Sequence, residues 1–348
     1  MAEVMSVNNL RDDLLYLFTF GPGTGESVLI RIPPDKWVVV DGCKDGKLVP
    51  AAETLRTNDA SWSCVVFSHP HKDHAEGLEA VLSLPGNGPV GCVRPILSNL
   101  DALQKSSDPH EHLSYGVVEQ LLSKIDDMWE ADPTKQWNVK QSDQQFIGDA
   151  VLTALHPDIA TIESSPRDPN ALSTPILIEW REVKLLLGAD LPSREWDALG
   201  QHFKGLEVHG GLKIPHHGSS GSVSVTFCGE GGDRGRYWVL TPFSPQRLPR
   251  FGDAEGLALL LRHVDKVHMT ALPQQRNLQG VVPYEATRID LRDGLAPTPI
   301  TTSLGTGVSA TPFSSPSEML RCYVIAGFNA TGELQDLRYG PGSVTVNG

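Results

Sequence analysis

Short apolar runs alternate with polar turns along the first three quarters of the chain. Runs rich in Val, Ile, Leu and aromatic residues, bounded by Gly, Pro or Asp, predict strands. These runs cover residues 14–20, 27–32, 37–42, 64–67, 150–155, 175–180, 184–187, 211–214, 237–240 and 268–271. Apolar residues at helical spacing predict helices over 75–82, 111–130 and 254–264. Because strands and helices alternate while several strands form hairpin-like pairs, we expect an α/β (α+β) protein with mixed sheets and outer helices.

The character of the chain changes after residue 275. Thr, Ser, Gly and Pro dominate residues 276–348, and strand-like pieces occur there at 321–326 and 343–346. We therefore predict a main domain over 1–275 and a β-rich extension over 276–348, either packed on the main domain or partly mobile.

Composition narrows the class of protein. With 348 residues, 40% apolar and 20% charged, the chain is long enough for one large sandwich with insertions. The five cysteines are scattered without a C-x-x-C pair, which argues against a disulfide framework or a thiolate zinc knuckle. No apolar run approaches the roughly 18 residues of a membrane span, and the start of the chain does not resemble a signal peptide. We expect a soluble, cytoplasmic protein that does not bind membranes.

The net charge of −13 opposes non-specific contact with nucleic acid at long range. The charge is uneven, however: residues 101–170 hold thirteen acidic and five basic side chains, whereas residues 194–266 hold eight acidic and nine basic ones. A polyanionic substrate would therefore approach the second region, where Arg234, Arg236, Arg247 and Arg250 could contact phosphate.

The densest chemical signal is the run HPHKDH, which directly follows the predicted strand at 64–67. It places four side chains that can bind metal, His69, His71, Asp73 and His74, within six residues. Imidazole and carboxylate together suit zinc, iron or manganese, and the lack of a nearby thiolate favours a hydrolytic site over a structural one.

Three further candidates also stand where predicted strands end. Asp41 follows the strand at 37–40, and Asp190 follows the apolar run that ends at 187. A buried carboxylate there is costly unless it is paired or binds a metal. The pair His216 and His217 follows the strand at 211–214, and this position at a strand end strengthens the case that the pair is functional.

Together these pieces resemble the metallo-β-lactamase-fold hydrolases, most closely the branch that contains the hydrolase domain of the competence DNA-uptake channel (ComEC-like). The resemblance spans roughly residues 14–275. The matching pieces, in order, are GPGTGES (21–27), VDG (40–42), HPHKDH (69–74), LHP (155–157), NALS (170–173), LGAD (187–190) and KIPHHGS (213–219). It implies a four-layer αββα sandwich, here with a C-terminal β-rich extension.

The resemblance also implies a centre of two divalent ions, Zn²⁺ or Mn²⁺. His69 and His71 would hold the first ion, Asp73 and His74 the second, and Asp190 would bridge both. One of the two adjacent histidines would complete the shell of the second ion.

Of these two, we favour His216 as the ligand because it stands nearer to the strand, which leaves His217 as a catalytic side chain beside the ions. Asp41 would orient a ligand histidine from behind.

A third histidine for the first ion is less clearly marked. His156, after the strand at 150–155, is our candidate, and a structural His-Pro corner is the alternative. His110 and His112 precede an acidic helix and are weaker candidates. If none of these serves, a one-ion site becomes possible.

Two ions about 3.5–4 Å apart can share a hydroxide at neutral pH and polarise the scissile group. Asp73 or Asp190 could take the proton of the attacking water, and His217 could protonate the leaving group. We therefore predict a metal-dependent hydrolase.

The resemblance implies a phosphodiesterase or nuclease, so a phosphodiester or nucleic acid is the expected substrate. The alternatives are a hydrolase of small molecules (a lactone, thioester or β-lactam) and a weakly active subunit that binds a protein partner through the C-terminal extension.

Overall fold

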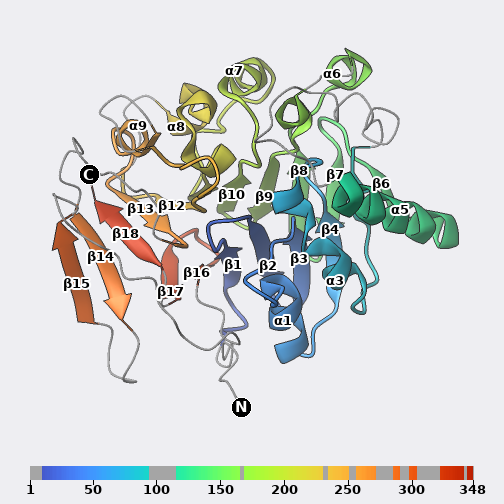
Figure 1. The fold of residues 1–348 in the computed structure, drawn as a ribbon, viewed down its shortest axis with the longest axis horizontal. Helices are drawn as coiled ribbons and strands as arrows, with labels where there is room; N and C mark the ends of the chain where they lie inside the picture. Colours follow the sequence, from blue (N-terminus) through green and yellow to red (C-terminus); the bar gives the residue numbers. More distant parts are fainter. Residues whose placement is uncertain are drawn as a thin grey trace.

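The computed structural model describes residues 10–93, 115–164, 168–229, 234–250, 256–271, 285–290, 298–303, 322–340 and 343–347. These residues form two large mixed sheets that lie face to face, with helices outside (Figure 1).

The first sheet has eight strands and carries the N-terminal half of the chain. In sheet order these are β17 (Leu334–Tyr339), β16 (Tyr323–Phe328), β1 (Leu15–Phe20), β2 (Ser27–Ile32), β3 (Lys36–Val40), β4 (Trp62–Val66), β5 (Val90–Cys92) and β6 (Gln136–Asn138). Strands β3 to β6 run parallel to one another, whereas β1 pairs antiparallel with both β2 and β16.

The second sheet has ten strands. In sheet order these are β15 (Thr298–Ser303), β14 (Glu285–Asp290), β18 (Val344–Asn347), β13 (Lys266–Met269), β12 (Tyr237–Leu240), β11 (Gly211–Lys213), β10 (Val183–Leu187), β9 (Ile176–Trp180), β8 (Ala150–Ala154) and β7 (Gln144–Ile147). Its central strands β10 to β13 are parallel.

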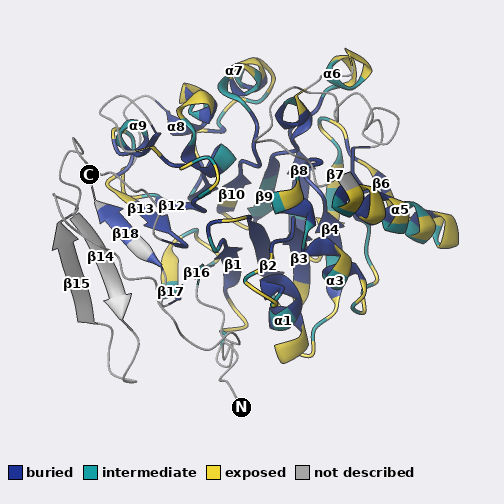
Figure 2. Ribbon diagram, in the orientation of Figure 1, coloured by how far each residue is buried: buried dark blue, intermediate teal, exposed yellow. Residues whose placement is uncertain are grey.

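Helices cover the outer face of each sheet. On the first sheet lie α1 (Pro50–Thr57), α2 (Lys72–Ala75), α3 (Leu78–Leu82) and α5 (Tyr115–Ala131), and on the second lie α7 (Ser193–His202), α8 (Val225–Cys228) and α9 (Gly256–Leu260). Helix α6 (Ile159–Ser164) follows β8. Figure 2 shows buried strands in the middle and exposed residues on the outward faces of the helices.

Two apolar clusters hold these layers together. The larger one joins the inner faces of both sheets, for example Leu17 of β1 and Leu185 of β10, and it reaches out to α1 and α5. The second lies between the ten-stranded sheet and α7 to α9, around Trp196, Phe227 and Trp238. Burial of apolar surface on both faces of each sheet is the main source of stability. The predicted αββα sandwich is confirmed.

The predicted helix at 75–82 is divided by Gly77 into α2 and α3. A Cβ atom at Gly77 would lie 2.6 Å from the backbone oxygen of Cys43, so only glycine lets the two segments approach this closely. The backbone N–H of Gly77 donates to the oxygen of Gly42 at 3.1 Å. This contact places the loop after β3 against the HPHKDH segment.

The predicted amphipathic helix at 111–130 is confirmed over 115–131, and its first four residues fall outside the described part of the chain. The helix at 254–264 is shorter, with α9 covering 256–260. Short β5 and β6 and the hairpin strand β7 lie outside the predicted runs because three or four residues give too little periodicity to recognise.

The described part of the C-terminal region contributes strands to both sheets. Strand β16 pairs with β1, and β18 pairs with β13. Both strands are therefore hydrogen-bonded parts of the two main sheets. The division of the chain into two domains at residue 275 stays a prediction. Within the described ranges, no helix has the length and apolar character needed to cross a bilayer.

Candidate metal centre

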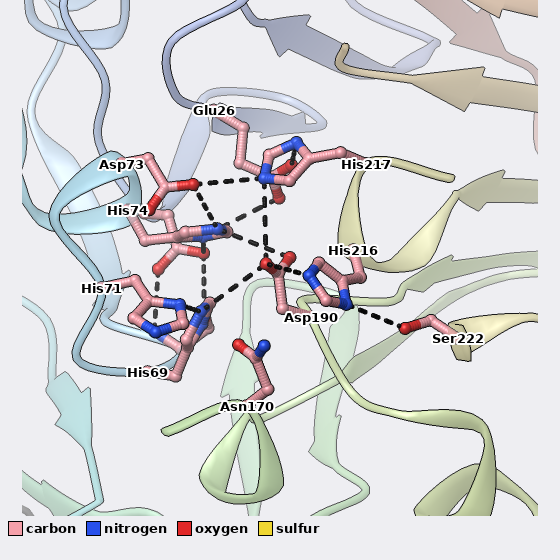
Figure 3. A network of polar contacts seen from close by, with 12 residues as sticks. Glu26, His69, His71, Asp73, His74, Asn170, Asp190, His216, His217 and Ser222 are labelled. Carbon is pink, nitrogen blue, oxygen red and sulfur yellow. Dashed lines mark hydrogen bonds and ion pairs between the residues drawn. The ribbon is translucent and has the colours of Figure 1, made fainter. Parts of the chain in front are cut away.

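The candidate side chains gather because the strands before them are parallel neighbours. Asp41 follows β3 and His69 follows β4 in the first sheet, while Asp190 follows β10 and His216 follows β11 in the second. The carboxyl ends of parallel neighbours meet at one edge of a sheet. Because the two sheets lie face to face, these two edges meet across the sandwich, as Figure 3 shows.

The loops at these edges adopt unusual backbone conformations. Asp41, Ala189, His216 and His217 have φ values of 60°, 46°, 46° and 52°, which are uncommon for residues other than glycine. The backbone N–H of His216 donates to the oxygen of Ala189 at 2.8 Å, which ties the two loops of the second sheet together. Strained conformations of this kind persist where the surroundings hold them, often at functional sites.

Asp41 holds the HPHKDH loop from behind. Its Oδ1 accepts from the backbone N–H of Ser68 at 2.8 Å, and its Oδ2 accepts from the Ser68 hydroxyl at 2.6 Å and from Nδ1–H of His74 at 2.8 Å. The Oγ of Ser68 lies 2.9 Å from Nδ1 of His69. In His69 and His74, Nδ1 therefore makes a hydrogen bond on the side away from the centre, and the lone pair of Nε2 is directed into the centre. The predicted orienting role of Asp41 fits this arrangement.

One set of donor atoms surrounds Nε2 of His74. Asp73 Oδ2 lies 3.6 Å from it and 3.2 Å from Nε2 of His217, while Asp190 Oδ1 lies 3.5 Å from Nε2 of His74. Asp190 Oδ2 lies 3.8 Å from Nε2 of His217. Donors that share one tetrahedral ion at about 2.0–2.2 Å are about 3.3–3.6 Å apart. These four side chains, called the second donor set below, therefore have the spacing of an ion site.

A smaller set, called the first donor set, consists of His69, His71 and Asp190. Nε2 of His69 lies 3.0 Å from Nδ1 of His71 and 3.8 Å from Oδ2 of Asp190. The ligand atoms of these three side chains all lie within 4.8 Å of one another. Asp190 thus faces both sets through its two oxygens, as expected of a bridging carboxylate.

Buried atoms without partners test whether the residues fit metal ions. Among the described residues, Nε2 of His74, Nε2 of His71 and Oδ1 of Asp190 are buried and make no hydrogen bond. Each such atom costs about 1–3 kcal/mol unless something satisfies it. A cation between the two sets would satisfy the atoms of His74 and Asp190, so the donor set fits divalent ions.

The charges of the centre are strongly coupled. Burial opposes ionisation of Asp190 and Asp73, yet the neighbouring histidines, His74 foremost, hold the pKa of both carboxyls below the usual value. Burial also opposes the charging of His74 and His217, but Asp190 and the other carboxylates raise the pKa of both rings. Because protonated imidazole is no ligand, an incoming ion must displace these protons.

The other histidines of the centre behave differently. Burial lowers the pKa of His69 and His71, so these rings are neutral at neutral pH and ready to bind an ion. Burial also lowers the pKa of His216.

Sequence analysis missed Glu26, which lies behind the second donor set. Its side chain is 2% exposed, and its Oε2 lies 2.6 Å from Nζ of the equally buried Lys213 and 3.4 Å from Nδ1 of His217. Although Glu26 belongs to a group that could hold a cation with His74, Asp190 and His217, it faces the Nδ1 sides of both rings. We therefore assign it to the support of the ligands and not to the ion itself.

The GPGTG turn carries Glu26 into this position. The backbone N–H of Glu26 donates to the oxygen of Asp73 at 3.0 Å, and a Cβ atom on Gly25 would lie 2.6 Å from the same oxygen. The turn thus brings backbone close to the loop that carries Asp73. A glutamate and a lysine 187 positions apart gave no signal of pairing in the sequence alone.

The positions of His216 and His217 differ from what the sequence suggested. His217 is 1% exposed, donates from Nδ1 to the backbone oxygen of Thr241 at 2.8 Å, and directs Nε2 at Asp73 and Asp190. The His216 side chain is 20% exposed, and its Nε2 lies 4.0 Å from Oδ2 of Asp190. The positive φ of both residues turns the second ring inward, so distance along the chain from the strand was a poor guide.

His156 is not brought to the centre. Its Nδ1 donates to the backbone oxygen of Ser173 at 3.0 Å, and the ring lines a separate cavity of about 170 Å³ with Gln141, Arg194 and His202. Burial lowers its pKa to about 4, as expected for a neutral structural histidine. The His-Pro corner, the alternative reading of this position, describes the contact. His110 and His112 lie outside the described residues.

The four arginines proposed to contact phosphate divide into two pairs. Arg234 pairs with Asp265 at 2.6 Å, and Arg236 donates to the backbone oxygens of Glu207 and Cys228, so both support loops of the fold. Arg247 and Arg250 are exposed on the segment that follows β12. The backbone N–H of Ser244 in this segment donates to the oxygen of Gly23 at 2.7 Å, which brings it to the rim of the centre.

Comparison with known proteins finds partial similarity to solved structures only. No protein-family model matches the chain, and no curated protein matches it in sequence. A metallo-β-lactamase with a HARLDQ motif from Cronobacter sakazakii aligns at 14% identity and a TM-score of 0.34, over 50% of this chain and 60% of that one. The diiron β-hydroxylase CmlA from Streptomyces venezuelae aligns at 16% identity and a TM-score of 0.34, over 60% of this chain and 35% of that one.

A metallo-β-lactamase from Staphylococcus aureus aligns at 15% identity and a TM-score of 0.30, over 50% of this chain and 42% of that one. The chain therefore covers less than two thirds of each of these three proteins. Two of these proteins are named metallo-β-lactamases, and the third is a diiron β-hydroxylase.

Proposed function

We propose that this protein is a metal-dependent hydrolase with two divalent ions, Zn²⁺ or Mn²⁺, at the centre described above. The observation that carries the proposal is the pair of donor sets that share Asp190, with buried ligand atoms that make no hydrogen bond. Ions bound there would activate water at neutral pH and polarise the scissile group.

The side chains around the donor sets have separate tasks in this proposal. Asp41, Ser68 and Glu26 lock the ligand rings by hydrogen bonds and charge, so the centre needs little reorganisation during reaction. Asp73 and Asp190 belong to the donor sets, so their carboxylates would be close enough to accept a proton from the attacking water.

His216 is our candidate to contact the leaving group. It is the only partly exposed imidazole among the two adjacent histidines, and its Nδ1 lies 3.1 Å from Oγ of Ser222. If that hydroxyl donates to Nδ1, the proton of the neutral ring sits on Nε2, from which the ring can donate a hydrogen bond that stabilises the charge on a departing oxygen.

We propose a phosphodiester as the substrate, in line with the ComEC-like resemblance of the sequence motifs. Two neighbouring cations suit the two oxygens of a phosphoryl transfer. The exposed Arg247 and Arg250, on the segment whose Ser244 contacts Gly23, add positive charge in an otherwise acidic protein. A nucleic acid would meet the net charge of −13 elsewhere on the surface. A short or single phosphodiester therefore fits more easily than a long duplex.

The test is a comparison of purified protein, loaded with Mn²⁺ or Zn²⁺, on bis(p-nitrophenyl) phosphate, single-stranded DNA and a panel of lactones and thioesters. We expect turnover of phosphodiesters that is lost with a chelator and returns when the ion is added back. Turnover confined to the lactone or thioester panel would overturn the phosphodiester assignment, but the assignment as a metal-dependent hydrolase would stand. A protein that binds ions yet turns over neither group would favour the binding subunit.

A further inference from the structure

Asn170 is a buried amide at the edge of the metal centre that the mechanism above does not use. It belongs to the short 3-10 helix η2 (Pro169–Leu172), where the carboxylate of Asp168 accepts from its backbone N–H at 2.9 Å. The residue is 4% exposed, and its side-chain oxygen is buried without a hydrogen-bond partner. In Figure 3 the amide points toward Asp190 and the rings beside it.

Contacts on both sides of η2 bring this segment against the centre. The backbone N–H of Thr174 donates to the oxygen of Ser68 at 3.0 Å, next to His69. On the other side, Figure 3 shows Asp190, on the loop after β10, next to Asn170. Asn170 therefore lies between the loop of the first sheet and the loop of the second.

The first donor set has one protein donor fewer than the second. It has three protein side chains, whereas the second donor set has four. The histidine expected to complete the first set, His156, bonds to the backbone of Ser173 in another cavity. Leaving an amide oxygen buried and unpaired costs about 1–3 kcal/mol, so a ligand that satisfies Asn170 would recover that free energy.

We propose that the side-chain oxygen of Asn170 is the fourth protein donor of the first donor set, in the place expected for His156. This inference rests on the proposed metal centre and deepens it. The Nδ2 group would then lie on the side away from the ion.

The exchange of imidazole for an amide oxygen has a chemical consequence. Carboxylate, carbonyl and water oxygens suit Mg²⁺ and Mn²⁺, whereas imidazole suits zinc. With two imidazoles, one carboxylate and one neutral amide, the first set discriminates less strongly for Zn²⁺ over Mn²⁺ than a three-histidine set does. The first ion is consequently the more weakly held and the more easily exchanged of the two.

The test measures ion binding directly and does not depend on turnover. Full-length protein is stripped with a chelator and titrated with Mn²⁺, and separately with Zn²⁺, by calorimetry. We expect two Mn²⁺ ions in the wild type and a roughly 10–100-fold weaker affinity for one of them in Asn170→Ala. Asn170→Asp, which keeps an oxygen donor, should retain both ions, and Asn170→His should shift the weaker site toward Zn²⁺.

His156→Ala is the matched control, because it removes the histidine that the sequence favoured for the same role. It should bind both ions with wild-type affinity. Wild-type affinities in Asn170→Ala, or loss of an ion in His156→Ala, would overturn the assignment of Asn170. A shift in KM alone with unchanged ion binding would also overturn it and make Asn170 a substrate contact.

Two further results separate this inference from the proposed function. If the wild type binds no ion in stoichiometric amount, both fail together. If Asn170→Ala does not fold, as judged by circular dichroism, the Zn²⁺/Mn²⁺ preference of Asn170→His decides: an unchanged preference contradicts the proposal.

Discussion

The carboxylate of Asp41 accepts a hydrogen bond of 2.8 Å from Nδ1–H of His74, across 33 residues of sequence. The same carboxylate receives two hydrogen bonds from Ser68, so one buried anion orients both the ring of His74 and the loop that carries the other histidines. The backbone of Asp41 has a φ of 60°, which aims its side chain at this loop. The geometry of both donor sets therefore depends on a residue that lies behind them.

Asp41→Asn tests this dependence. The amide would present an N–H group to at least one partner that now donates, so the ring of His74 would lose its fixed orientation. We expect about 10–100-fold weaker ion binding. Calorimetric titration measures the change, and Asp59→Asn, which alters an exposed carboxylate outside the donor sets, is the control. Unchanged affinity in Asp41→Asn would contradict the orienting role.

Removing a side chain of the first donor set, or the carboxylate shared by both sets, should abolish hydrolysis. His71→Ala removes one of the two imidazoles of the first donor set, and Asp190→Ala removes the carboxylate that faces both sets. We expect no turnover above background in either variant and a lower metal content by elemental analysis. Prolonged chelation of the wild type should have the same effect on turnover. Wild-type rates in either variant would rule out this site assignment.

The two adjacent histidines should separate binding from chemistry. His217→Ala removes a buried ring that contributes to the second donor set, so the bound ions should decrease in number or affinity. His216→Ala removes a partly exposed ring at a greater distance, so both ions should remain while kcat falls by roughly 10²–10⁴-fold. The opposite pattern, with ions lost in His216→Ala, would restore the roles suggested by the sequence.

The buried pair of Glu26 and Lys213 should be a large stability determinant. Lys213→Met would leave the Glu26 carboxylate buried without its cation, at a cost of about 3–5 kcal/mol in the free energy of unfolding. The double variant Glu26→Gln with Lys213→Met should lose less than Lys213→Met alone, because no unpaired charge remains. Urea denaturation of the metal-free variants measures both values, and equal losses would show that the pair acts through packing and not through charge.

A buried histidine far from the ions should make stability depend on pH. Burial lowers the pKa of His268 to about 3, and its Nδ1 lies 2.7 Å from the hydroxyl of Tyr339. In the unfolded chain His268 takes up a proton near pH 6.5, whereas in the folded chain it stays neutral at that pH. Its contribution to the free energy of unfolding is therefore complete above pH 6.5 and is lost as the pH falls.

Between pH 6.5 and 5 we expect His268 to account for about 2 kcal/mol of lost unfolding free energy. His268→Phe keeps an aromatic ring beside Tyr237, which stacks on the imidazole at 5.1 Å between centroids. Urea denaturation at both pH values should give a shallower dependence in this variant. An identical dependence in variant and wild type would mean that His268 is protonated at little cost.

Mixed sheets with outer helices and most strands were accessible from the sequence because apolar periodicity reflects burial directly, whereas the αββα layering came from the resemblance of the motifs. Runs such as 64–67 and 211–214 are buried on both faces in the structure and could be recognised without a partner. The three-residue strands β5 and β6 were not, since their pairing depends on neighbours far along the chain. The helix break at Gly77 follows from a contact with Cys43 that no local pattern contains.

What the sequence determined by itself is the chemistry of the centre: the donors His69, His71, Asp73 and His74 lie within one short run, and their types already define a cation site. What only the tertiary structure decided is which distant side chains join them. His217 lies closer to the carboxylates than His216, and His156 bonds to the backbone elsewhere. The pair of Glu26 and Lys213 lies behind the centre, and the buried amide of Asn170 lies at its edge. The physical reason is that ligand geometry is set within tenths of an ångström by backbone turns and buried hydrogen bonds between strands, and these long-range contacts have no local sequence signature.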